Sequence, residues 1–179
     1  VPLLGIFVAL VTFVGLLVTA TPANAYVLYG CEYDNNSINP ISYRFFSVGS
    51  DYETAFTDGQ ARWDAADVPG YFAEQSWSLD PEVNVTDGVY GGGYYALTTW
   101  GCSGGLYSGN ETNIRFDTQE MASLAAWQKR NIAIHELGHS YGLADVSGSL
   151  CRVMNAAKAL AGSCYFPASD DINGVNAIY

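Results

Sequence analysis

The stretch HELGHSYGLAD, which spans His135–Asp145, carries the most informative pattern of the chain. His135 and His139 are four residues apart, so an α-helix would place both imidazole rings on one face, aimed at a common point. The apolar spacing predicts a helix from about residue 124 or 127 through residue 141. Gly142 predicts the end of that helix in a left-handed turn. The expected fold is therefore organised around a helix that presents two imidazoles.

Two imidazoles one helical turn apart are typical of a zinc site, which needs a further protein ligand and an open position for water. The chain contains two histidines, and both lie in this stretch. Glu136 is the last glutamate of the chain, so the third ligand must be a downstream aspartate. Asp145, three residues after the Gly142 turn, is the favoured candidate. The other downstream acids, Asp170 and Asp171, have the pattern of a helix cap.

Glu136 is adjacent to the first imidazole and can reach a water molecule on the metal. Zinc lowers the pKa of such a water towards neutrality, and Glu136 would accept its proton as general base. The prediction is a secreted zinc-dependent endopeptidase that acts on protein or peptide substrates, with zinc as cofactor. The alternative is a secreted zinc-binding module without turnover, which could dispense with the glutamate.

The rest of the chain predicts an α+β domain with a mixed sheet backed by helices. β-branched and aromatic residues separated by glycine-rich turns predict the strands. Three- and four-residue apolar spacing predicts two more helices, one beginning at a cap formed by Ser50 and Asp51. The expected strands are 41–48, 83–89, 94–100 and 113–116, and the expected additional helices are 50–66 and 169–178.

The first 25 residues carry no charge and close with the small-residue triplet of Ala23, Asn24 and Ala25. This pattern predicts a secretory signal peptide over 1–25, with a transmembrane anchor as the alternative. Residues 26–179 are then one catalytic domain, secreted and extracellular. No membrane association is expected after signal removal, and the expected state is a monomer.

The net charge argues against some classes of binding partner, and the cysteine content predicts disulfides. The formal net charge is −11, which argues against nucleic acid or an anionic membrane as partner. Four cysteines in an exported chain predict two disulfides, for which three pairings exist. The favoured pairing is Cys151–Cys164 with Cys31–Cys102. A cysteine-ligated metal is the less favoured alternative, since the cysteines form no Cys-x-x-Cys pair.

The His135–Asp145 stretch, followed by Met154, resembles the metzincin clan of zinc peptidases in the form with aspartate as third ligand, which the snapalysins use. Residues 113–117 and 170–174 are similar to the matrixin catalytic domain. The likeness runs from about residue 41 to 179 and is dense from 113 onward. It implies a metzincin-like zincin domain with a mixed, mostly parallel twisted sheet and an active-site helix that ends at a glycine turn.

The same resemblance implies further roles. Met154 would form a turn beneath the metal site without binding the metal. The segment between Met154 and Ser169, with Tyr165 and Phe166, would line a substrate pocket. Acids in similar positions bind calcium in matrixins, and calcium prefers oxygen ligands. The candidates here are either calcium ligands or solvated surface acids, and they are Asp87, Asp117 and Glu120.

Overall fold

The computed structural model describes residues 26–34, 36–76, 80–162 and 164–179. The predicted signal peptide, residues 1–25, lies outside the described residues. The elements are β1 (Ile41–Phe45), α1 (Ser50–Asp64), β2 (Phe72–Glu74), β3 (Val83–Gly88), β4 (Ala96–Ser103), β5 (Leu106–Asp117), α2 (Ala126–Ser140), α3 (Ala156–Leu160) and α4 (Ser169–Ile178).

Five strands form one mixed sheet in the order β2-β1-β3-β5-β4. Neighbouring strands from β2 to β5 are parallel, and only the edge strand β4 is antiparallel to its neighbour β5. Gly104 and Gly105 turn the chain from β4 into β5 with positive φ angles, which glycine adopts without steric cost. The predicted α+β class with a mostly parallel mixed sheet is confirmed at this level.

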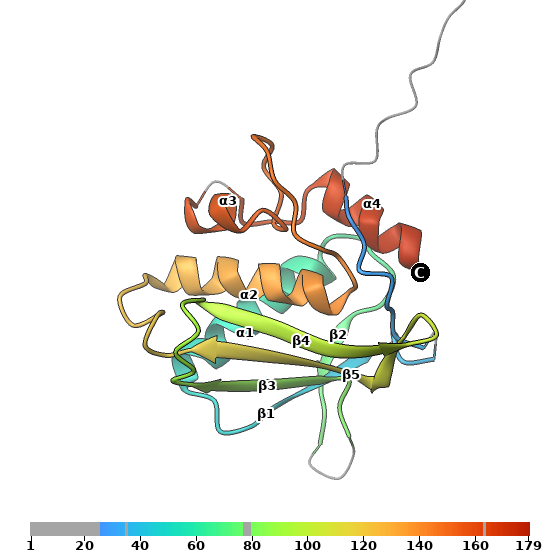
Figure 1. The fold of residues 1–179 in the computed structure, drawn as a ribbon, viewed down its shortest axis with the longest axis horizontal. Coiled ribbons are helices and arrows are strands. Elements are labelled where there is room, and N and C mark those ends of the chain that lie inside the picture. Colours follow the sequence, from blue (N-terminus) through green and yellow to red (C-terminus); the bar gives the residue numbers. More distant parts are fainter. Residues whose placement is uncertain (1–25, 35, 77–79, 163) are drawn as a thin grey trace, which may run out of the picture.

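The helices form the other layers of the molecule. Figure 1 shows α1 and α2 on the same side of the sheet, with α2 beside the β4 edge and with α3 and α4 beyond α2. The buried face of α1 carries apolar residues at three- and four-residue steps, ending at Trp63. The Trp63 indole N–H donates to the Ile134 carbonyl of α2 at 2.8 Å. Gly59 permits this approach, because a Cβ there would lie 3.1 Å from the Ile134 nitrogen.

A second glycine, Gly138 of α2, sets the packing of α2 against Met154 and Trp63. A Cβ at Gly138 would lie 2.2 Å from the Met154 sulfur and 3.1 Å from the Trp63 ring. Met154 is buried, with 1% of its surface exposed, so its thioether has little room to move. The sequence therefore needs a residue without a side chain at position 138 for Met154 to lie against the helix.

We expect Gly138→Ala to lower the free energy of unfolding by about 1–3 kcal/mol or more, since the added methyl group overpacks a filled core. Gly88→Ala is the matched control, because a Cβ there meets the Tyr90 ring at 3.4 Å, an ordinary contact. Urea unfolding of both variants measures the difference. Equal stability of Gly138→Ala and the wild type would contradict the packing described.

The structure corrects several predicted elements. The helix α1 begins at Ser50, so its N-cap is Gly49 and not Ser50. The Gly49 N–H donates to the Asp87 carboxylate of β3 at 2.9 Å, a contact that local sequence does not reveal. The strand β2 and the helix α3 have too few residues for a periodic signal, so neither was predicted. Strands β4 and β5 pair with each other as far as Ser103 and Leu106. Both strands are therefore longer than predicted.

The two disulfides are Cys31–Cys102 and Cys151–Cys164, the favoured pairing. Their Cα–Cα distances are 5.9 Å and 5.3 Å. Disulfides persist in oxidising compartments, so they fit an extracellular protein.

Within the part of the chain that the structure describes, no helix has both the length and the hydropathy to cross a bilayer.

Candidate metal centre

Three side chains converge at the end of α2. The His135 and His139 Nε2 atoms are 3.1 Å apart, and Asp145 Oδ1 lies 3.2 Å and 3.7 Å from them. Ligands bound tetrahedrally to zinc at about 2.0–2.1 Å are about 3.3 Å from one another. The observed spacing fits that requirement. Among the described residues these three form the one cluster of His, Cys, Asp or Glu that could hold a metal ion.

Backbone carbonyls orient both imidazoles. The Nδ1 atom of His135 lies 2.8 Å from the Val153 oxygen, and that of His139 lies 2.8 Å from the Leu143 oxygen. A carbonyl only accepts hydrogen bonds, so each Nδ1 carries the proton and each Nε2 presents its lone pair to the cluster. Metal-binding histidines are commonly held in this way. The rings are thus in the tautomer that a metal requires.

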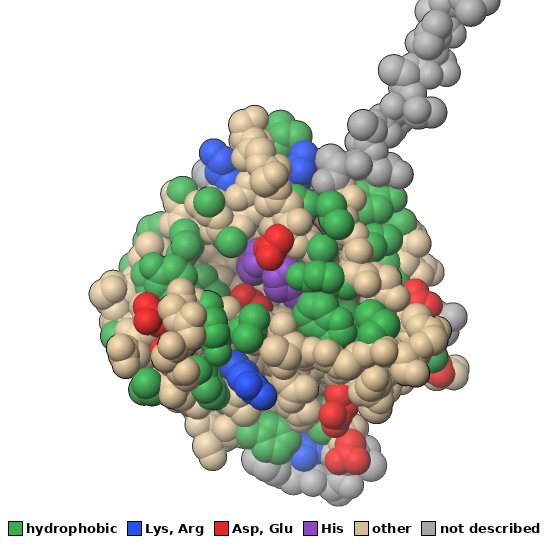
Figure 2. All heavy atoms as spheres, viewed as in Figure 1, with side chains coloured by type: hydrophobic (Ala, Val, Ile, Leu, Met, Phe, Trp, Pro, Cys, Tyr) green, Lys and Arg blue, Asp and Glu red, His purple; other side chains and the backbone are tan. Residues whose placement is uncertain are grey.

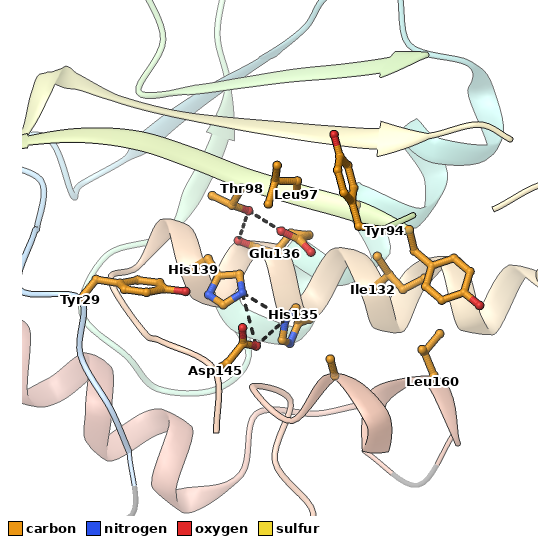
Figure 3. A pocket seen from close by; sticks show the side chains of 13 residues that line it. Tyr29, Tyr94, Leu97, Thr98, Ile132, His135, Glu136, His139, Asp145 and Leu160 are labelled. Carbon is orange, nitrogen blue, oxygen red and sulfur yellow. Dashed lines mark hydrogen bonds and ion pairs between the residues drawn. The ribbon is translucent and has the colours of Figure 1, made fainter. Parts of the chain in front are cut away.

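The turn after α2 delivers the carboxylate. Gly142 has a φ of 102°, a left-handed conformation that favours glycine. The Leu143 N–H then donates to the Gly138 carbonyl at 3.1 Å, which closes the helix end. Asp145 follows within three residues and is bent back over the two imidazoles, as Figure 3 shows. The position predicted for Asp145 from the Gly142 turn is the observed one.

The three side chains of the cluster shift one another's pKa values. Burial lowers the pKa of His135. In the protonated ring, however, Nε2–H donates to Asp145, and the Glu136 charge and the Val153 carbonyl add to this, so the net shift is upward from 6.5. Burial and the neighbouring His135 lower the pKa of His139. The hydrogen bond with His135 lowers the pKa of the Asp145 carboxyl. Protons therefore compete with a metal mainly at His135.

We expect zinc affinity to fall at least about 30-fold between about pH 8 and pH 5, because the metal needs a neutral imidazole and the pKa of His135 is above 6.5. The sign follows from that upward shift: the ring is neutral above its pKa and protonated below it. Titration against a competing chelator across this range measures the effect. An affinity that does not change with pH would contradict it.

The Glu136 side chain is buried and held beside the imidazoles. Its Oε2 accepts a hydrogen bond from the Thr98 hydroxyl at 2.6 Å, and the same hydroxyl lies 3.1 Å from the Glu136 carbonyl oxygen. Thr98 is on the edge strand β4, so the sheet fixes the carboxylate of the helix. Thr98 could not be found from the sequence, because the contact joins residues 38 positions apart.

The other downstream acids have structural roles. Asp171 accepts backbone hydrogen bonds from Ala168 at 2.8 Å and from Val153 at 3.0 Å. It therefore caps α4, as predicted, and also fixes the segment whose carbonyl orients His135. Asp170 lies 2.9 Å from Arg152. Neither acid belongs to the metal cluster, and Met154 lies against Gly138 of α2.

A cavity of about 270 Å³ opens beside the cluster. Figure 2 shows the histidines in a surface hollow surrounded largely by hydrophobic side chains. Tyr165 and Phe166 are not among the residues that line it; Phe166 lies against Arg62 instead, 4.2 Å from its guanidinium carbon. From the segment after Met154, α3 contributes Ala156 and Leu160. The expected pocket wall is thus formed by α3.

The structure does not assemble the predicted calcium ligands Asp87, Asp117 and Glu120 into a metal-binding cluster among its described residues. The buried Asp117 carboxylate accepts four backbone hydrogen bonds, from residues 90, 91, 119 and 120. Asp87 accepts one from Gly49. Asp117 and Asp87 thus stabilise loops and the start of α1, and calcium binding by these acids stays a prediction.

The fold and the site together define an α+β protein with a three-ligand candidate metal centre beside an apolar cavity. No protein-family model matches the chain, and no curated protein matches it. Among solved structures 71 chains match. One is described as the GM1 bound form of the ECX AB5 holotoxin, with 14% sequence identity, a TM-score of 0.54, and coverage of 87% of this chain and 88% of that chain.

This match corrects the prediction of a secreted zinc-dependent endopeptidase. The matched structure is described as a GM1-bound holotoxin. That description concerns binding and not peptide hydrolysis. The endopeptidase function is therefore not retained. At this identity the likeness shows the fold alone, so any function of the present chain must be argued from its own residues.

Proposed function

We propose that His135, His139 and Asp145 hold one zinc ion and that the chain is a metal-dependent hydrolase. The observation that carries the proposal is the 3.1–3.7 Å spacing of the three ligand atoms. Two imidazoles and one carboxylate are a donor set that zinc accepts, and three protein ligands leave a coordination position open. When bound, the ion would act as a Lewis acid that polarises a carbonyl and lowers the pKa of water.

The chain's own groups supply the proton transfer. The Glu136 carboxylate can accept a proton from a water molecule that attacks a carbonyl carbon, and can then donate it to the leaving group. Thr98 holds one of its oxygens, which leaves the other free to face the water. The apolar cavity would hold the side of the substrate that does not react.

The finer fold assignment is part of the same proposal. A metzincin-like fold is supported by the glycine turn at Gly142, by Asp145 beside the imidazoles, and by Met154 against the base of α2. The mixed, mostly parallel sheet with α2 beside its edge strand is compatible with it.

Metal analysis and hydrolysis assays test the proposal together. The purified chain should contain one zinc ion per molecule, and zinc-loaded protein should hydrolyse a member of a panel of small ester and amide substrates. Chelator should remove the activity, and added zinc should restore it. Protein that binds no zinc, or zinc-loaded protein without activity on the whole panel, contradicts the hydrolase.

A second candidate is a zinc-binding module that binds its ligand without turnover. The observation that favours it is the likeness in fold to a structure described as a GM1-bound holotoxin. In that case zinc content would be the same, and the cavity would bind a ligand that is recovered unchanged. Mass spectrometry of the ligand after incubation distinguishes the two functions.

A further inference from the structure

The described N-terminal segment runs across the end of the metal-binding helix. The Tyr29 N–H donates to the Gly142 carbonyl at 2.9 Å, and the Ala144 N–H donates to the Val27 carbonyl at 2.7 Å. Between them Leu28 and Leu143 form an antiparallel bridge. The same turn that carries the third metal ligand therefore also fixes the backbone of Tyr29.

The Tyr29 ring lies over the centre. Its centroid is 4.3 Å from the Trp100 ring of β4 and 5.5 Å from the His139 ring. The disulfide between Cys31 and Cys102 anchors the chain two residues further on. Figure 3 shows the hydroxyl end of Tyr29 directed towards His139 and Asp145, and the residue lines the cavity.

The hydroxyl has a hydrogen left to donate. A phenol is both donor and acceptor, and its own O–H remains available to a molecule in the cavity. The Glu136 Oε2 accepts from the Thr98 hydroxyl, and the Nδ1–H groups of both imidazoles donate to carbonyls. Tyr29 therefore provides an O–H donor at the cavity wall beside the metal ligands.

We propose that Tyr29 recognises the ligand of this centre by donating its O–H to an oxygen of a carbonyl or tetrahedral anionic group. The inference rests on the proposed metal centre. In hydrolysis the water oxygen bonds to the carbonyl carbon, the carbonyl π pair moves onto its oxygen, and Glu136 takes the water proton. Tyr29 keeps its own proton and stabilises the negative oxygen.

The test measures binding of phenylphosphonate, a tetrahedral anion with an apolar ring, to zinc-loaded protein by calorimetry. Tyr29→Phe keeps the ring packing and removes the donor, so we expect affinity to fall about 10-fold or more. Tyr29→His restores an N–H donor and should recover part of it. Tyr71→Phe, an exposed tyrosine that does not line the cavity, is the control and should bind like the wild type. Zinc content should be equal in all four proteins.

Hydrolysis provides the second readout. If the chain hydrolyses a substrate of the panel, Tyr29→Phe should lower kcat about 100-fold with little change in KM. Equal phosphonate affinity of wild type and Tyr29→Phe, or no binding by zinc-loaded wild type, overturns the inference. A chain that hydrolyses nothing but loses phosphonate affinity in Tyr29→Phe contradicts the hydrolase and supports the role of Tyr29.

Discussion

Glu136→Gln should lower kcat by about 10²–10⁴-fold while zinc content stays the same, because the amide cannot accept a proton from water. Gln has nearly the shape of Glu and can still accept the hydrogen bond from Thr98, so the helix and the two imidazoles should keep their positions. Stopped assays on the best substrate of the panel, with metal analysis of the same samples, measure both quantities.

Glu74→Gln serves as the matched control for this substitution. Glu74 is exposed at the end of β2 and does not line the cavity, so its variant should keep wild-type kcat. Unchanged turnover in Glu136→Gln would exclude the carboxylate as the proton acceptor. Loss of zinc from that variant would instead show that Glu136 is needed to build the metal site.

Asp145→Asn should weaken zinc binding by more than about 100-fold. Loss of an outer partner of a metal ligand already costs about 10–100-fold in affinity, and loss of a ligand's charge should cost more. The side chain of Asp145 is 66% exposed, so the substitution leaves no buried polar group unsatisfied, and the fold should remain intact. Competition with a chelator of known affinity measures the loss, and circular dichroism checks the fold.

Asp58→Ala, on an exposed position of α1, controls for the general effect of removing one negative charge from a chain of net charge −11. It should bind zinc as the wild type does. If Asp145→Asn retained wild-type affinity, the three-ligand centre would be wrong. The ion would then need another carboxylate, and Asp170 or Asp171 could be examined in the same way.

The calcium prediction stays a prediction, and Asp117 shows why the sequence does not decide it. Asp117 looks like a free loop acid in the sequence, but in the fold its carboxylate accepts four backbone N–H groups. A carboxylate that already accepts four hydrogen bonds stabilises the loop itself. Sequence spacing does not distinguish this role from cation binding, because both use oxygen atoms close to a turn.

Local sequence determined the features that depend on helical period and on the properties of single residues. The four-residue step placed His135 and His139 on one face of α2, and the conformational freedom of Gly142 ended that helix ahead of Asp145. Only the tertiary structure decided what surrounds them. Thr98 on Glu136 and Tyr29 over His139 come from segments 38 and 110 residues away in the chain, and no periodic pattern encodes such contacts.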